Sequence, residues 1–170
     1  MSAVIESLAP TGTWNADPVH SNVSFEVAYA GVNTFRGSFT DFSASLAGSS
    51  LEGVAKVASV DVKDEQLNGH LQTPDFFDAE RFPEISFTTS DLETGELTIK
   101  GVTRPVKIEA TVSEPNIDPF GRERVGITLA ATVDRNEYGV SWNAPNQGGG
   151  NYLGDDVTIK ADLALVRAAA

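Results

Sequence analysis

The chain has 170 residues, with 24 acidic against 12 basic side chains, a net charge of −12 and no cysteine. This length predicts a single domain that can bury a core without disulfide or metal staples. The absence of cysteine excludes disulfides, cysteine–zinc sites and thiol nucleophiles. The acidity disfavours nucleic acids and anionic membrane surfaces as partners.

Apolar and polar residues alternate along most of the chain, which is the pattern of half-buried β-strands. In the first such run Val23, Phe25 and Val27 share one face and leave the polar residues on the other. The alternation recurs, in chain order, over residues 35–40, 54–62, 85–89, 97–99, 106–112, 125–133 and 157–165. We expect about eight or nine strands, separated by turns at residues 31, 48–50, 94–95, 101, 115–121 and 148–150.

The segment Asp64–Arg81 departs from this alternation and predicts a short helix. Asp64 is a good N-cap residue, and Leu67 and Leu71 are four positions apart, so they share one helical face. Pro74 is expected to end the helix, because proline lacks the amide hydrogen that a helix interior needs.

Many strands at short spacing, without helices between them, predict an all-β fold, either an antiparallel barrel or a sandwich. The interior of a closed barrel of about eight strands is filled by side chains or holds one small ligand. A core filled by alternating large and small residues is the simpler interpretation, and a ligand cavity is the alternative. Small residues that would leave volume are Ala28, Gly37, Ala58, Ala110, Ala131 and Ala161.

Few residues suggest chemistry. The two histidines, His20 and His70, do not have the spacing of a metal site, and motifs of phosphate loops, zinc proteases and serine hydrolases are missing from the sequence. We therefore expect neither a metal nor catalytic residues. Phe76 and Phe77 either plug one end of a barrel or line an apolar tunnel, and Trp142 needs a hydrogen-bond partner if it is buried.

Several motifs resemble one known family. Residues 17–25 (DPVHSNVSF) are similar to the opening motif of the YceI-like, polyisoprenoid-binding proteins, and residues 70–78 (HLQTPDFFD) carry the densest resemblance. It continues through residues 35–42, 95–106 (GELTIKGVTRPV), 118–124 (DPFGRER), 135–143 (RNEYGVSWN) and 153–157 (LGDDV). One departure lies near Tyr29, where many members have a histidine.

The resemblance implies a lipocalin-like antiparallel β-barrel of about eight strands with a short helical insert. It also implies a long apolar pore that holds a polyprenyl phosphate or an isoprenoid quinone, with no other cofactor required. The residues expected to contact the lipid tail are Phe25, Val27, Phe39, Phe76, Phe77, Phe87, Leu129 and Trp142. Those expected near its head group are His20, Arg36, His70, Arg81 and Asn143. The net charge makes a diphosphate head less favourable than a neutral quinone.

We thus expect one YceI-like domain over residues 12–167, with tails at 1–11 and 168–170. Its expected function is binding, storage or transport of an isoprenoid lipid. The alternatives are a stress-related structural protein with an incidental cavity and an acid–base enzyme that uses His20 or His70. The first residues lack the features of a secretory signal, which indicates the cytoplasm. Neither a nucleic acid partner nor stable membrane insertion is expected, and an exposed sheet edge would permit a homodimer.

Overall fold

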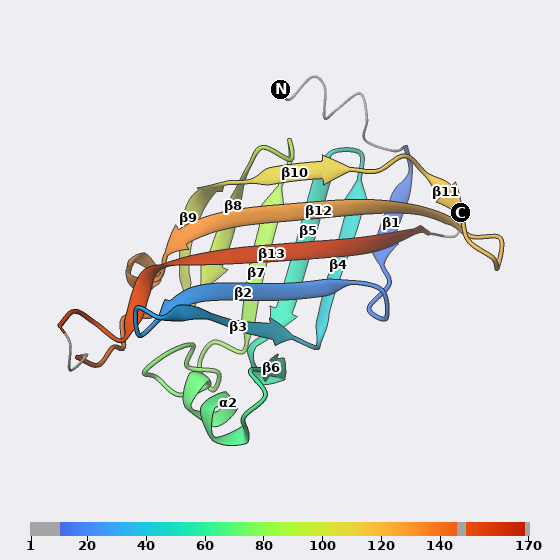
Figure 1. Cartoon of the computed structure of the whole chain (residues 1–170). Helices are drawn as coiled ribbons and strands as arrows, with labels where there is room; N and C mark the ends of the chain where they lie inside the picture. Colours follow the sequence, from blue (N-terminus) through green and yellow to red (C-terminus); the bar gives the residue numbers. More distant parts are fainter. Residues whose placement is uncertain (1–10, 146–148, 169–170) are drawn as a thin grey trace.

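A computed structural model describes residues 11–145 and 149–168, and this part is built mainly from thirteen antiparallel strands (Figure 1). The all-β class is therefore confirmed. Residues 1–10 of the expected tail 1–11, residues 169–170 of the expected tail 168–170 and the turn residue Gly148 lie outside the described residues. The strands are β1 (Thr13–Ala16), β2 (Asn22–Tyr29), β3 (Asn33–Phe39), β4 (Phe42–Ala47), β5 (Ser50–Lys56), β6 (Val60–Asp61), β7 (Glu84–Thr89), β8 (Thr94–Ile99), β9 (Val102–Lys107), β10 (Glu109–Val112), β11 (Asn116–Ile117), β12 (Glu123–Asp134) and β13 (Leu153–Arg167). The helices are α2 (Glu65–Leu71) and two 3-10 helices, η1 (Val57–Ser59) and η2 (Arg135–Tyr138).

The longest strand, β13, organises the sheet. One edge of β13 pairs with β12, while its other edge pairs with β1 near the carboxyl end and with β2 over the rest. The sheet therefore divides at β13 into one arm that continues through β3 and β6 and another that runs through β4, β5, β7, β8 and β9. Figure 1 shows the strands β12, β13, β2 and β3 crossing steeply in front of β4, β5 and β7, so the sheet forms two layers.

The two ends of the sheet are joined by a bend in the chain. β9 pairs with β8, whereas β10, which follows directly, pairs with β12. Between them Ile108 leaves both ladders, and its amide donates to Glu93 O at 2.9 Å. Within the described residues no ladder joins β9 to β12, so the hydrogen-bonded ring is interrupted at this bend.

Two predicted strands are divided in the structure. This division explains part of the difference between the thirteen strands observed and the eight or nine expected. The predicted strand 106–112 bends at Ile108. The predicted strand 54–62 stops at Lys56, because the next residues form η1 and the Ser59 hydroxyl donates to Lys56 O at 2.7 Å. Three short strands, β1, β4 and β11, were missed. β1 and β11 are only four and two residues long, whereas Phe42, Ala44 and Leu46 of β4 do alternate with serines and could have indicated a strand.

The predicted helix is present, and Asp64 is its N-cap as expected. The Asp64 side chain accepts hydrogen bonds from the amides of Gln66 and Leu67, at 2.9 and 3.2 Å, so it satisfies two donors that the first turn leaves free. The helix ends at Leu71, before Pro74. Figure 1 shows α2 and the turns after it lying across one end of the sheet, beside β3 and β6.

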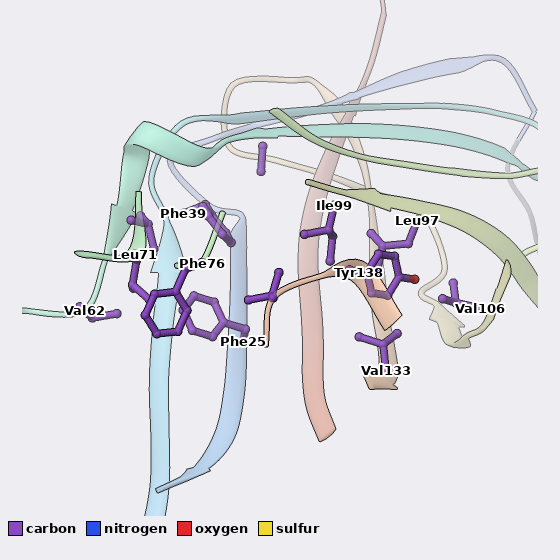
Figure 2. Close-up of a cluster of buried hydrophobic side chains, with 13 residues drawn as sticks. Phe25, Phe39, Val62, Leu71, Phe76, Leu97, Ile99, Val106, Val133 and Tyr138 are labelled. Atoms are coloured by element: carbon purple, nitrogen blue, oxygen red, sulfur yellow. The ribbon is translucent and has the colours of Figure 1, made fainter. Parts of the chain in front are cut away.

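Two clusters of buried side chains fill the space between the layers. The cluster near β1 is solid, with Trp14, Leu46, Ile127 and Leu165 completely buried. The other cluster is rich in aromatic rings and lies on the side of α2. Figure 2 shows Phe25, Phe39, Leu71 and Phe76 at one side of this second cluster and Leu97, Val106, Val133 and Tyr138 at the other.

Gly37 lets an aromatic ring fill the interior. Phe25 is its direct cross-strand neighbour, and a Cβ at position 37 would lie 2.8 Å from Phe25 Cε1 and 2.7 Å from Val62 Cγ1. This small residue therefore leaves no empty volume, contrary to the expectation from the sequence. Ala28 and Ala58 are exposed and leave none either.

We predict that Asp64→Ala lowers the free energy of unfolding by about 1 kcal/mol, because two amides of α2 lose their acceptor. Asp64→Asn keeps an acceptor oxygen and is the matched control. Urea denaturation of the three proteins measures the effect. Equal stability of the alanine and asparagine variants would contradict the capping role.

We predict that Gly37→Ala destabilises the protein by about 1–3 kcal/mol, because the new methyl group overlaps the Phe25 ring. Gly53→Ala is the matched control, since the nearest neighbour of a Cβ there would be Ser43 O, at 3.7 Å. Thermal unfolding should show a lower midpoint for Gly37→Ala only. Phe25→Leu in the Gly37→Ala background should restore part of the loss.

Candidate functional site

A cavity of about 270 Å³ lies within the aromatic cluster. Its walls come from the inner faces of β2 and β3, from α2 and the turns after it, and from the region around η2. Most of the lining side chains are aliphatic or aromatic. Such a concave, largely apolar space is the usual form of a small-molecule site.

A second cavity of about 110 Å³ adjoins the first and extends toward the solid cluster, where Leu51 and Leu163 line it. The two cavities have lining residues in common, namely Val23, Ala55, Ile85, Leu97 and Ile159. They are therefore neighbouring compartments of one apolar interior. Ala131 and Ala161, two of the small residues expected to leave volume, line the second compartment.

Each residue expected to contact a lipid tail lies in the wall of one of these cavities. Phe87 and Leu129 line the smaller one, and the others line the larger one: Phe25, Val27, Phe39, Phe76, Phe77 and Trp142. The Phe39 ring lies between two others, with centroid distances of 5.7 Å to Phe25 and 6.0 Å to Phe77. The structure thus brings these side chains together, and their contact with a lipid stays a prediction.

Three aromatic side chains meet where α2 approaches the residues after η2. The centroid of the His70 ring lies 5.0 Å from that of Phe76 and 5.1 Å from that of Trp142, with both pairs edge to face. A hydrogen bond of 3.0 Å joins His70 Nε2 to Asp75 Oδ2. His70 is therefore held in the cavity wall by two rings and one carboxylate.

Lys100 ties together two segments that line this cavity. Its Nζ donates to the carbonyl oxygen of Pro74 at 2.6 Å and to that of Gly139 at 3.1 Å. Pro74 belongs to the turns after α2, and Gly139 caps η2. One ammonium group therefore links the helical insert to the segment that carries Tyr138 and Trp142.

Two tyrosines supply polar atoms elsewhere in the larger cavity. The hydroxyls of Tyr29 and Tyr152 form a short hydrogen bond, and their rings meet edge to face at 4.8 Å. This bond raises the pKa of Tyr152 above its ordinary value. The pair joins the end of β2 to the residues just before β13.

Arg135 is a buried cation in the wall of the larger cavity, with 6% of its surface exposed. Its Nε donates to Gly154 O at 2.8 Å, and Nη1 donates to Val140 O and Trp142 O at 2.7 and 2.9 Å. Burial lowers its pKa, although nearby Asp155 and Asp134 oppose this shift. Sequence reasoning missed Arg135, because an arginine after a strand is usually exposed.

Of the five head-group candidates, His70 alone lines the larger cavity. Arg36 lies on the outer face of β3, with its Nε 3.5 Å from Glu26 Oε1 and 67% of its side chain exposed. Arg81 is also exposed, and its Nε donates to Asp78 Oδ2 at 2.6 Å. Both arginines are therefore engaged outside the cavity.

Asn143 and His20 have other partners. The Asn143 side chain exchanges two hydrogen bonds of 2.8 Å with the backbone of Leu153. His20 lies in the loop between β1 and β2, where its Nδ1 bonds Asp17 at 2.8 Å. This bond, followed by weaker ones that include Arg124, lowers the pKa of Asp17 to about 2. His20 lines neither cavity.

Two features are absent from residues 11–145 and 149–168. In these residues no three acidic, histidine or cysteine side chains gather as a metal site. In the same ranges no helix has the length and apolar character needed to cross a membrane.

The sequence pattern of the YceI-like domain matches residues 14–165. A UPF0312 protein of Staphylococcus aureus (strain USA300) is 31% identical over 157 residues, which covers 85% of this chain and 92% of the relative. Among solved structures, Burkholderia cenocepacia BcnA superposes with a TM-score of 0.73 at 24% identity, covering 88% of this chain and 98% of BcnA.

A polyisoprenoid binding domain from Saccharophagus degradans, implicated in plant cell wall breakdown, also has a TM-score of 0.73. It is 12% identical, and the match covers 91% of this chain and 98% of that domain. These structural likenesses concern the fold, while the domain pattern and the staphylococcal relative extend over most of the chain. The chain therefore belongs to the YceI-like family.

Proposed function

We propose that this protein binds an isoprenoid lipid, a polyprenyl phosphate or an isoprenoid quinone, inside the two adjoining cavities, and stores or transports it. The observation that carries this proposal is the pair of apolar compartments of about 270 and 110 Å³ with shared lining residues. Membership of the YceI-like family and the likeness to a polyisoprenoid binding domain support the same class of ligand.

The chemistry of the walls suits a branched hydrocarbon chain. Burying apolar surface yields roughly 25 cal/mol per Å², or about 0.8 kcal/mol for each methylene, without any directed bond. Aliphatic and aromatic side chains supply such contacts along both compartments. A tail that begins beside Phe77 in the larger cavity can continue past Ile159 toward Leu129 in the smaller one.

Two other functions remain alternatives. One is a stress-related structural protein in which the cavity is incidental. The other is acid–base catalysis by the His70–Asp75 pair, which lies at the larger cavity. A cytoplasmic location and a homodimer stay predictions from the sequence.

Mass spectrometry of organic extracts from freshly purified protein tests the proposal. We expect an isoprenoid lipid in a constant ratio to protein. An extract without any lipid, together with no uptake of added isoprenoids, would favour the structural alternative. Conversion of an added lipid to a new product, lost in His70→Gln, would favour catalysis.

We predict that Phe25→Asp and Phe87→Asp abolish lipid retention in variants that still fold, because each places a carboxylate in an apolar cavity wall. Phe120→Asp is the matched control, since Phe120 is 83% exposed and lines neither cavity. Lipid extraction and circular dichroism measure the two effects. Folded Phe25 or Phe87 variants that retain the same lipid at the same ratio would place the tail outside the barrel.

Replacing a fully buried phenylalanine by alanine typically lowers the free energy of unfolding by about 3–5 kcal/mol. We predict a smaller loss for Phe77→Ala, because Phe77 is half-buried and borders a cavity. The amount or type of bound lipid should change instead. Phe82→Ala is the control: Phe82 is also half-buried in the same insert, but it packs against Gly101 rather than lining a cavity. Chemical denaturation and lipid extraction distinguish the two variants.

A further inference from the structure

The guanidinium of Arg135 has one nitrogen without a partner. Nε and Nη1 together donate three hydrogen bonds to backbone carbonyls, whereas Nη2 is buried and donates to no partner among the described residues. An unpaired buried donor is costly, and the cost is larger when the group is charged.

No carboxylate pairs directly with Arg135 in the part of the chain that the structure describes. Asp134 and Asp155 act on its charge through space, but both carboxylates accept hydrogen bonds from the Asn136 side chain, at 2.9 Å each. The positive charge is therefore balanced at a distance, while the N–H group of Nη2 lacks an acceptor.

Arg135 lies in the wall of the larger cavity, between two other lining residues of its own segment, Val133 and Tyr138. The cavity is otherwise mostly apolar, so an oxygen atom of a bound ligand is the acceptor that this site lacks. We propose that Arg135 is the head-group residue of this protein, and that its Nη2 donates a hydrogen bond to a carbonyl oxygen of the bound lipid. This inference rests on the proposed function and deepens it.

Charge favours a carbonyl over a phosphate at this position. Because Nε and Nη1 are already occupied, Arg135 cannot offer the paired N–H groups that bind phosphate in a fork. Asp134 and Asp155 lie close enough to oppose a second anion. A neutral acceptor, such as the oxygen of a quinone ring, satisfies Nη2 without adding charge to a chain of net charge −12.

Three ligands with the same geranylgeranyl tail test the head group: a menaquinone, its 2-methylnaphthalene analogue, which keeps the ring but lacks both carbonyl oxygens, and the monophosphate of the free alcohol. Their affinities are measured by quenching of tryptophan fluorescence, since Trp142 lines the cavity. For the unmodified protein we expect the menaquinone to bind at least about tenfold more tightly than the other two, the size expected for a hydrogen bond to a charged group. Arg135→Gln should remove this preference and leave the affinity for the naphthalene analogue within about threefold.

The matched control is Arg104→Gln. Arg104 is half-exposed, pairs with Glu137 of η2 at 3.0 Å and lines neither cavity. The Arg104→Gln variant should bind all three ligands with the affinities of the unmodified protein. Equal binding of menaquinone and its naphthalene analogue to the unmodified protein would overturn the inference while leaving the proposed function intact. Binding of none of the three would instead overturn the proposed function.

A preference for the monophosphate that is lost in Arg135→Gln would overturn the carbonyl assignment. Because Arg135 also holds three backbone carbonyls, its variants can fail to fold. Infrared spectroscopy of menaquinone bound to the unmodified protein then decides the matter. We expect a carbonyl stretch at lower frequency than in hexane, and an unshifted band would overturn the inference.

Discussion

The pairing of β13 with three other strands is the constraint on which the rest of the structure depends. Along one edge it forms a continuous ladder with β12, from Val166 opposite Arg124 to Asp156 opposite Asp134. Along the other edge β1 and β2 follow one another, separated by the loop that carries His20. Since β1 and β2 lead into different arms of the sheet, the two arms diverge from one strand and enclose an interior. Side chains fill that interior completely around Trp14 beside β1 and leave a small cavity beside Leu51 and Leu163 and a larger one near α2.

The strand faces could be predicted from alternation, and the tail-contact candidates on strands accordingly line the two cavities. Phe25 and Val27 on β2, and Leu129 on β12, project inward because residues two apart share a face. The same rule places Arg36 outward, since Phe35 faces the cavity. Alternation alone therefore argues against Arg36 as a head-group residue. The cap at Asp64 could be predicted because it depends only on residues within one turn.

Other features depend on partners far apart in the sequence. The bend at Ile108 is stabilised by Glu93, and the place of Tyr152 depends on Tyr29. Arg135 is buried because three carbonyls converge on it, from Val140, Trp142 and Gly154. None of these carbonyls is marked by a residue type, so neither composition nor spacing indicates that this arginine is inside.

The contacts of Lys100 have a consequence for the kinetics of ligand exchange. Its ammonium group bonds the carbonyls of Pro74 and Gly139, so the helical insert and the segment after η2 are not free to separate independently. Opening of the interior on this side then requires a local unfolding event in which at least one of these bonds breaks. For any ligand that leaves the cavity on this side, the activation enthalpy of release would include the rupture of this bridge. Conditions that stabilise the bridge would slow uptake and release alike, without changing the ratio of the two rates.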